Sequence, residues 1–260
     1  ESAGQVLLVA LEPEDECGAM FLRLRKGTRK SGLKVATVAP FTSNGSRKMN
    51  ARLLHAAPGA EPGVVDAIKA GGAYADVAEA LSGGVVLVGE RAARVPGLLS
   101  SVVALAERTG ARLAWVPRRA GDRAAIEAGL LPGLAPFGRT IDEAGAADLG
   151  WGELPERGLD AEQMIEAAAA GEFKALVVGG VDVRDFDDPG AVRAALDEVP
   201  FLVSLEVRAS EITDRADVVL PVAPAVEKNG TFINWEGRLR PFGQARSATS
   251  LTDRDVLVRL

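Results

Sequence analysis

The stretch "VLLVALEPEDECGAMFLRLRKGTRKSGLKVATVAP" occupies residues 6–40 and decides the fold class. Its two apolar segments, 5–11 and 33–40, are short and rich in branched residues, as the buried strands of a parallel sheet are. Residues 13–30 between them begin with acids and end with bases, which matches the dipole of a helix. The order strand, helix, strand predicts a βαβ unit with parallel strands.

The same alternation continues along the chain. Further strands are predicted at 83–90, 111–117, 173–180, 200–206 and 216–222. Further helices are predicted at 62–71, 74–81, 96–109, 122–128, 160–170 and 188–198, whereas 42–59 reads as a loop. We therefore expect an α/β protein of two Rossmann-like, three-layer (αβα) units with mostly parallel sheets and ligand crevices at the carboxyl ends of the strands.

A glycine pair, Gly83–Gly84, precedes the strand expected at 83–90. Because glycines commonly punctuate the chain between structural elements, we place the boundary between the two units near residue 82. The predicted units are residues 1–82 and 83–260.

Composition excludes several classes of function. The 260 residues are 47% hydrophobic, so a sizeable core is available, and the net charge of −6 does not favour a nucleic-acid-binding protein. No apolar run approaches the roughly 18–20 residues that span a membrane. The single cysteine, Cys17, and the single histidine, His55, are too few for a cluster of metal ligands, and Cys17 is expected to be a small core residue.

The chain enters a strand almost at its first residue and ends inside a predicted helix, "SLTDRDVLVRL" (250–260), without a stop signal. We expect both ends to be truncated from a longer chain.

The turns that follow the strands at 5–11 and 83–90 lack the glycine patterns that hold phosphates. Acids crowd the first of these turns at Glu12, Glu14, Asp15 and Glu16. They satisfy the positive end of the helix themselves and would repel a phosphate.

A glycine-rich stretch, "EKNGTFINWEGR" (227–238), follows the strand at 216–222. Its glycines would let a backbone come close to another group and would aim polar side chains at that group. The alternative interpretation is a β-hairpin whose Gly and Asn residues take left-handed conformations.

The longer stretch "DRADVVLPVAPAVEKNGTFINWEGRLRPFGQA" (214–245) resembles a signature of the molybdopterin oxidoreductase family. The resemblance covers nearly the whole chain. It implies the fold of the central domains of formate dehydrogenase and dimethyl sulfoxide reductase, in which this loop faces the pterin pocket.

Within that family, "LEPEDECGAMFLRLRK" (11–26) and "VAPAVEKNGTFINWEGRLRPF" (222–242) look most like the G-subunit branch of respiratory complex I, of an actinobacterial type. The resemblance implies a part of proton-pumping NADH:quinone oxidoreductase on the cytoplasmic face of the bacterial inner membrane. It implies the other peripheral-arm subunits as partners, with neither nucleic acid binding nor membrane insertion. Iron–sulfur clusters would belong to an N-terminal part outside this chain.

The chain departs from the family's cofactor-binding pattern at Glu12, Ala39 and Phe41, where active relatives typically carry Asn, Asp and Arg. The departures imply that this portion holds no cofactor, no metal and no catalytic residue. The family's pterin-loop positions would then form a vestigial pocket, with Glu236 and Arg238 as a buried structural pair and both glycines in tight turns. These positions are Gly230, Thr231, Asn234, Glu236, Gly237 and Arg238.

Two other functions remain open at this point. The intact loop is compatible with the central domains of an active enzyme that uses molybdopterin guanine dinucleotide, such as a formate dehydrogenase or nitrate reductase. An unrelated nucleotide-binding module is the third possibility, against which the missing phosphate turns count.

Overall fold

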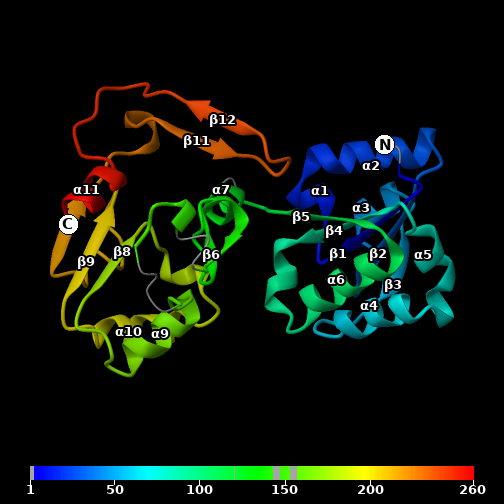
Figure 1. The fold of residues 1–260 in the computed structure, drawn as a ribbon, viewed down its shortest axis with the longest axis horizontal. Helices are drawn as coiled ribbons and strands as arrows, with labels where there is room; N and C mark the ends of the chain where they lie inside the picture. The colour runs from blue at the N-terminus through cyan, green and yellow to red at the C-terminus, as the bar shows by residue number, and fades with distance from the viewer. Residues whose placement is uncertain (1–2, 120, 143–146, 153–156) are drawn as a thin grey trace. The chain divides into compact units, whose positions relative to one another are not determined.

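The computed structural model describes residues 3–119, 121–142, 147–152 and 157–260, and the chain divides into two compact units, residues 1–122 and 123–260 (Figure 1). Each unit is built around a parallel sheet, so the predicted α/β class and the mostly parallel sheets are confirmed. No helix among the described residues is long and apolar enough to cross a bilayer.

The first unit holds a five-stranded sheet in the order β3-β2-β1-β4-β5, with every neighbouring pair parallel. Its strands are β1 (Gln5–Val9), β2 (Lys34–Ala39), β3 (Arg52–His55), β4 (Val85–Gly89) and β5 (Arg112–Val116). The strand β1 is buried at all five positions, as its uninterrupted apolar sequence predicts.

Helices cover both faces of this sheet, and Figure 1 shows α2 on one side with α4 and α6 on the other. The helices are α1 (Pro13–Glu16), α2 (Gly18–Lys30), α3 (Asn44–Lys48), α4 (Glu61–Ala70), α5 (Ala75–Ala80) and α6 (Leu98–Thr109), with short 3-10 turns η1 (Gly72–Tyr74) and η2 (Glu90–Arg94). One core layer lies between the sheet and α4–α6, where Val65, Ile68, Leu98 and Leu105 pack against strand residues such as Leu7.

The boundary expected near residue 82 is wrong. Strand β4 pairs directly with β1, so the segment after 82 completes the first sheet, and the division between the units lies at 122/123. A Cβ at Gly84 would lie 2.8 Å from the carbonyl oxygen of Gln5. The glycine therefore permits close backbone approach at the entry to β4 and does not mark a linker.

Two smaller expectations also fail. The helix expected over 13–30 is broken at Cys17, which immediately precedes α2 and has a non-helical φ of −152°. Cys17 is only half-buried, so it is not a core residue. The loop expected over 42–59 contains α3 and the edge strand β3. Only Leu53 and Leu54 are apolar within β3, too short a run to predict a strand.

The second unit holds a parallel sheet in the order β10-β9-β8, formed by β8 (Leu176–Gly179), β9 (Leu202–Glu206) and β10 (Val218–Pro221). Its helices are α7 (Asp122–Glu127), α9 (Ala161–Ala169), α10 (Pro189–Asp197) and α11 (Asp253–Arg259), with 3-10 turns η3 (Pro136–Gly138), η4 (Val183–Asp185) and η5 (Ala225–Glu227). Two antiparallel hairpins complete it, β6 (Leu134–Ala135) with β7 (Arg139–Thr140) and β11 (Gly230–Ile233) with β12 (Leu239–Phe242).

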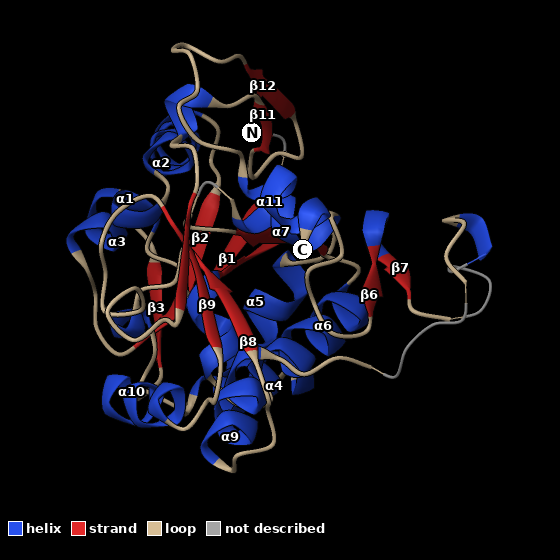
Figure 2. Cartoon of the chain, turned by 90° about the vertical axis from the view of Figure 1, so that its left-hand side faces the viewer, coloured by secondary structure: helices blue, strands red, loops and turns tan. Residues whose placement is uncertain are grey.

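The three-stranded sheet is covered on both faces. Val192 and Leu196 of α10 pack with Leu202 of β9, whereas Val256 of α11 packs with Val203 and its neighbours on the opposite face. Helices α9 and α10 lie side by side (Figure 2). The layer order is therefore the αβα arrangement that the sequence predicts.

Candidate functional site

The strand order of the first unit places its expected ligand crevice at the carboxyl ends of β1 and β4. In a doubly wound sheet the ligand lies outside the carboxyl edge, where the chain turns in opposite directions from two neighbouring strands. Here that point falls between β1 and β4. The turn after β1 carries Glu12 and the turn after β4 carries Glu90, so both turns present a carboxylate.

The side chain of Glu12 fills space beside α3. A Cβ at Gly45 would meet the Glu12 carboxylate at well under the 3.0 Å that real Cβ atoms keep. The same carboxylate accepts a hydrogen bond from the backbone N–H of Glu14 at 3.4 Å, and the Glu12 N–H donates to the Glu16 carboxylate at 3.0 Å. Glu12 therefore serves to cap α1, as its sequence position predicts.

Two other acids of this edge, Glu14 and Glu16, are paired with cations of the same unit. Arg91 of η2 donates to the Glu16 carboxylate at 2.6 Å, and Lys48 of α3 pairs with Glu14. An open hollow of about 610 Å³ lies here, lined by Glu12, Glu14, Asp15, Phe41, Thr42, Ser43, Asn44, Gly45, Arg47 and Lys48. The structure thus places Glu12 and Phe41, two of the departures from the family pattern, on one surface.

Backbone closes the space between the ends of β1 and β4. The carbonyl oxygen of Ala10 would lie far inside 3.0 Å of a Cβ at Gly89, so only glycine fits there. Ala10 itself has a φ of 50°, a left-handed conformation that costs a non-glycine residue free energy. The turn that contains Ala10 therefore lies directly against Gly89, the last residue of β4.

The loop with the family signature is a β-hairpin, as the alternative interpretation of 227–238 predicted. Strands β11 and β12 pair from Gly230↔Phe242 to Ile233↔Leu239, and the rings of Phe232 and Phe242 stack with centroids 5.1 Å apart. Gly230 lies in β11 and not in a tight turn, contrary to expectation. Its missing side chain makes room for the Phe242 ring, which would clash with a Cβ.

The turn of this hairpin is organised by Asn234. Its side-chain oxygen accepts the backbone N–H groups of Glu236 at 3.1 Å and Arg238 at 2.9 Å, and its carbonyl accepts the N–H of Gly237 at 2.8 Å. Gly237 has a φ of 78°, which confirms the tight turn predicted at that position. Thr231 is exposed on β11.

Arg238 pairs with Glu236 at 3.2 Å, but the pair is not buried as expected. The Arg238 side chain is 64% exposed and that of Glu236 is 25% exposed. Glu236 and Arg238 are two residues apart in one turn, so their pairing was predictable from the sequence. The turn is exposed and little protein surrounds it, so the pair is not buried.

The base of the hairpin is fixed to the start of α11 and to the segment that precedes it. Lys228 pairs with Asp253, and the Glu227 carboxylate accepts the backbone N–H of Thr249 at 3.2 Å. Val222 and Leu251 form an isolated parallel bridge, so the chain after the hairpin returns to the end of β10, from which the hairpin segment begins.

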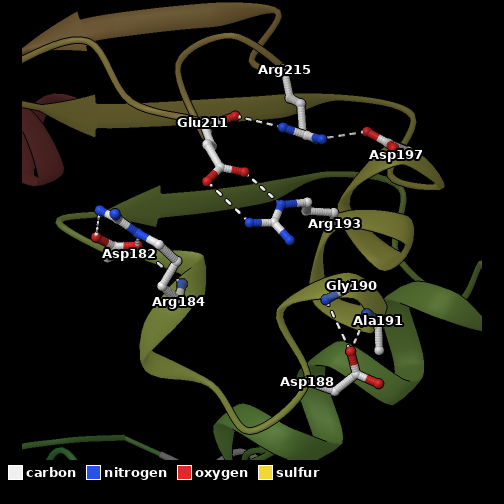
Figure 3. Close-up of polar contacts among 9 residues, drawn as sticks. All are labelled: Asp182, Arg184, Asp188, Gly190, Ala191, Arg193, Asp197, Glu211 and Arg215. Atoms are coloured by element: carbon white, nitrogen blue, oxygen red, sulfur yellow. Dashed lines mark hydrogen bonds and ion pairs between the residues drawn. The ribbon is translucent and has the colours of Figure 1, made fainter.

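A second polar cluster, missed by the sequence analysis, lies at the carboxyl edge of the second unit. Asp182, Arg184 and Glu211, which Figure 3 draws, line a hollow of about 530 Å³ formed by the segments after β8 and β9. Arg193 of α10 donates two hydrogen bonds to the Glu211 carboxylate, at 2.6 and 3.1 Å, and Arg215 donates to Asp197 at 2.8 Å. Strand-end position is the signal that could have found this cluster.

The charges of this cluster shift one another's pKa values. Two hydrogen bonds from the Arg184 guanidinium and one from its backbone N–H lower the pKa of Asp182 to about 2. The bidentate hydrogen bonds from Arg193 likewise lower the pKa of Glu211. These carboxylates are ionised at neutral pH and are occupied by arginine, so they are poorly suited to serve as general acids or bases.

The single histidine and the single cysteine belong to no cluster of metal ligands in the described parts of the chain. His55 is exposed at the end of β3, within the stretch 42–59 that was expected to be a loop. Among the described residues no three His, Cys, Asp or Glu side chains come together as a metal site would require.

Comparison with known proteins gives the family. The model of the molybdopterin oxidoreductase family matches residues 1–251. The chain is 52% identical over 257 residues to the NADH-quinone oxidoreductase G subunit of Mycobacterium tuberculosis, and the match covers 96% of this chain and 32% of that protein. It is 50% identical over 266 residues to the protein of the same name from Streptomyces coelicolor, and that match covers 98% of this chain and 32% of the relative.

A more distant relative is the NADPH-Fe(3+) oxidoreductase alpha subunit of Geobacter sulfurreducens, 35% identical over 134 residues, a match that covers 50% of this chain and 15% of that protein. The chain spans about a third of the length of its two actinobacterial relatives. The match to the family model over nearly all residues confirms the resemblance found in 214–245, and the chain belongs to the molybdopterin oxidoreductase family.

Proposed function

We propose that this chain is a portion of a G subunit of NADH:quinone oxidoreductase, where it serves as a structural and docking module without a pterin cofactor. The identity of 50–52% to two proteins of that name, over nearly the whole chain, supports the assignment to this branch. The partners would be other subunits of the peripheral arm, on the cytoplasmic face of the membrane. Iron–sulfur clusters would belong to other parts of the subunit.

The proposal that this portion holds no cofactor rests mainly on the position of the Glu12 carboxylate against Gly45. A bis-pterin dinucleotide carries several phosphates, which bind to glycine-rich backbone and cationic side chains. The edge of the first unit presents Glu12, Glu14 and Asp15 around its hollow, and of the two cations there Lys48 pairs with Glu14 and Arg47 donates to Asn44. The backbone of Ala10 lies against Gly89 and leaves little space between the ends of β1 and β4. These residues do not fit the group.

The chain's own residues therefore have a structural role in this proposal. Glu12 caps α1, Lys48 and Arg91 neutralise the neighbouring acids, and Asn234 holds the turn of the hairpin. The intact hairpin sequence favours the alternative, the central domains of an active molybdopterin enzyme. The hydrogen bonds that Asn234 accepts within the hairpin give that residue a structural role that requires no ligand.

The deciding experiment is cofactor analysis of the full-length subunit purified from its native host. Molybdenum and tungsten would be measured by mass spectrometry, and pterin by the fluorescence of its oxidised derivative. We expect neither in stoichiometric amount. A known molybdenum enzyme purified from the same cells is the control for cofactor supply, and one pterin per subunit would refute the proposal.

A further inference from the structure

The segment 129–141, "GLLPGLAPFGRTI", exposes large apolar side chains to water. Arg139 is its only charged residue, although 25% of the whole chain is charged. Leu130 is 74% exposed and Phe137 is 75% exposed, which makes Phe137 the most exposed of the described aromatic residues. Single exposed apolar residues are ordinary on a protein surface, so exposure alone assigns no role to them.

The backbone of Phe137 also has a conformation that a bulky residue rarely adopts. Its φ is 68° and its ψ is 30°, and Gly138 after it has a φ of 69°. Positive φ at both central positions is typical of a type I′ hairpin turn, for which Asn-Gly is a preferred pair. Glycine takes the second position without cost, whereas phenylalanine at the first position costs free energy.

Burial within the described chain does not offset this cost. The ring is exposed, and its contact with a charged group is with Arg139, whose guanidinium carbon lies 6.0 Å from the ring centroid. Ala10, which also has a positive φ, differs because its backbone packs closely against Gly89. A strained residue that gains little from its own fold indicates a role outside that fold.

The base of the β6–β7 hairpin holds this turn in place (Figure 2). Ala135, which precedes the turn, is buried and pairs with Arg139. A Cβ at Gly129 would lie 2.7 Å from the backbone of both Ala135 and Pro136, so the preceding segment packs directly against the hairpin. The ring of Phe137 therefore stands on an ordered turn, and a partner that bound it would have little backbone freedom to restrict.

Arg139 specifies the chemistry of the surface that would receive the ring. Its side chain is exposed and makes no ion pair among the described residues. Aromatic residues and arginine are both enriched at protein interfaces, and arginine is common among the residues that contribute most to binding. The ring requires an apolar socket, and the guanidinium beside it requires a carboxylate at the rim of that socket.

A protein socket fits these residues better than a bilayer does. Amphipathic segments that bind anionic membranes combine apolar residues with several cations. The segment 129–141 has one cation, and the net charge of the whole chain is −6.

A second copy of the chain is also a poor match. The hollows at the carboxyl edges of the two units carry charged side chains, such as Glu14 and Lys48 in one and Arg184 and Glu211 in the other. A separate protein also gains more from such an anchor than another part of the same chain would. Linked segments already meet at a high effective concentration, whereas separate chains must offset the freedom that they lose on binding.

We propose that Phe137 is an anchor that inserts into an apolar socket on another protein subunit, while Arg139 donates to a carboxylate at the rim of the socket. The identification of that protein as a subunit of NADH:quinone oxidoreductase rests on the proposed function. The anchor itself rests on the exposure and the backbone conformation of Phe137.

The test uses the tagged full-length subunit expressed in its native host, with recovery of the other NADH:quinone oxidoreductase subunits measured by quantitative mass spectrometry. Phe137→Asn removes the ring and introduces the residue that the turn prefers, so the fold should not lose stability. Phe137→Leu keeps an apolar side chain at the same position. Phe201→Ala is the matched control, because it removes another exposed phenylalanine, 45% exposed, from the same unit.

We expect Phe137→Asn to recover about tenfold less of at least one partner subunit, with a melting temperature equal to or above that of the wild type. Phe137→Leu should recover more than Phe137→Asn, and Phe201→Ala should match the wild type. Arg139→Gln should lower recovery most at low salt, where the attraction of its charge is least screened.

Equal recovery by Phe137→Asn and Phe201→Ala would overturn the inference and leave the proposed function standing. A lower melting temperature in Phe137→Asn would also overturn it, because the ring would then pack within its own chain. Failure of the wild type to recover any subunit would refute the proposed function, and the anchor would then be tested by cross-linking alone.

Cross-linking identifies what the ring contacts. The photoreactive amino acid p-benzoylphenylalanine, incorporated at position 137, keeps an aromatic ring at the tip of the turn. We expect illumination of the cells to join position 137 to one other protein subunit. A cross-link to the remainder of its own chain, to a second copy or to lipid, or the absence of any cross-link, would overturn the inference.

Discussion

Replacing Asn234 with Ala should open the turn of the β11–β12 hairpin while leaving the two sheets intact. The side-chain oxygen of Asn234 accepts two backbone N–H groups, those of Glu236 and Arg238. Alanine removes this acceptor and leaves both donors to water. The family signature loop would then lose the contacts that define its shape without losing any apolar contact.

The size of the effect follows from the two hydrogen bonds. Each contributes on the order of 0.5–1.5 kcal/mol when water competes for its partners, so their loss should lower the free energy of local opening by about 1–3 kcal/mol. That change multiplies the population of the open hairpin by a factor of about 5–160. The global free energy of unfolding should change much less, because the core clusters do not include the turn.

Amide hydrogen exchange over residues 230–242 measures this opening directly. Asn234→Asp is the matched control, since it keeps the accepting oxygen and should retain most of the protection. Arg238→Ala is the second control, because an exposed ion pair contributes only about 0–1 kcal/mol. Unchanged exchange in Asn234→Ala, or equal acceleration in Asn234→Asp, would refute the assignment of the turn to Asn234.

Two other perturbations follow from the geometry. Gly89→Ala should lower the free energy of unfolding by about 1–3 kcal/mol in chemical denaturation, because its Cβ would meet the backbone of Ala10, whereas Gly63→Ala on α4, with open space around it, should be neutral or stabilising; equal effects would contradict this. Asp182 should titrate near pH 2 in a carboxyl-detected NMR experiment, and Arg184→Gln should return its pKa toward 3.8. Since folding lowers this pKa, its contribution to stability is complete above about pH 3.8 and disappears as the pH falls through 2, and a wild-type midpoint near 3.8 would rule out the pairing.

Much of the fold follows from local sequence, and the failures have physical causes. Strands such as β1 and β9 are uninterrupted apolar runs and were predictable as buried parallel strands, whereas β3 contributes only two apolar residues and was not. The glycine at 84 was interpreted as punctuation because a sequence does not reveal that Gln5, far away along the chain, will lie against it. Close backbone approach is a tertiary property.

The candidate site divides in the same way. The capping role of Glu12 and the left-handed turn at Gly237 are local features, and both were predictable. The ion pair of Arg193 with Glu211 joins residues 18 apart that only the folded sheet brings together. The exposure of Arg238 depends on how much protein surrounds the hairpin, which no local pattern encodes.

The closed base of the hairpin has a consequence for how this loop can vary among relatives. Because Val222 and Leu251 form a bridge and Lys228 pairs with Asp253, the chain leaves and rejoins the sheet at one place. Segments with adjoining ends can be lengthened, shortened or exchanged as cassettes, since the cost of closing a loop grows only slowly with its length. The tip from Asn234 to Arg238 is therefore a position at which a reporter peptide could be inserted without disturbing the β8–β10 sheet.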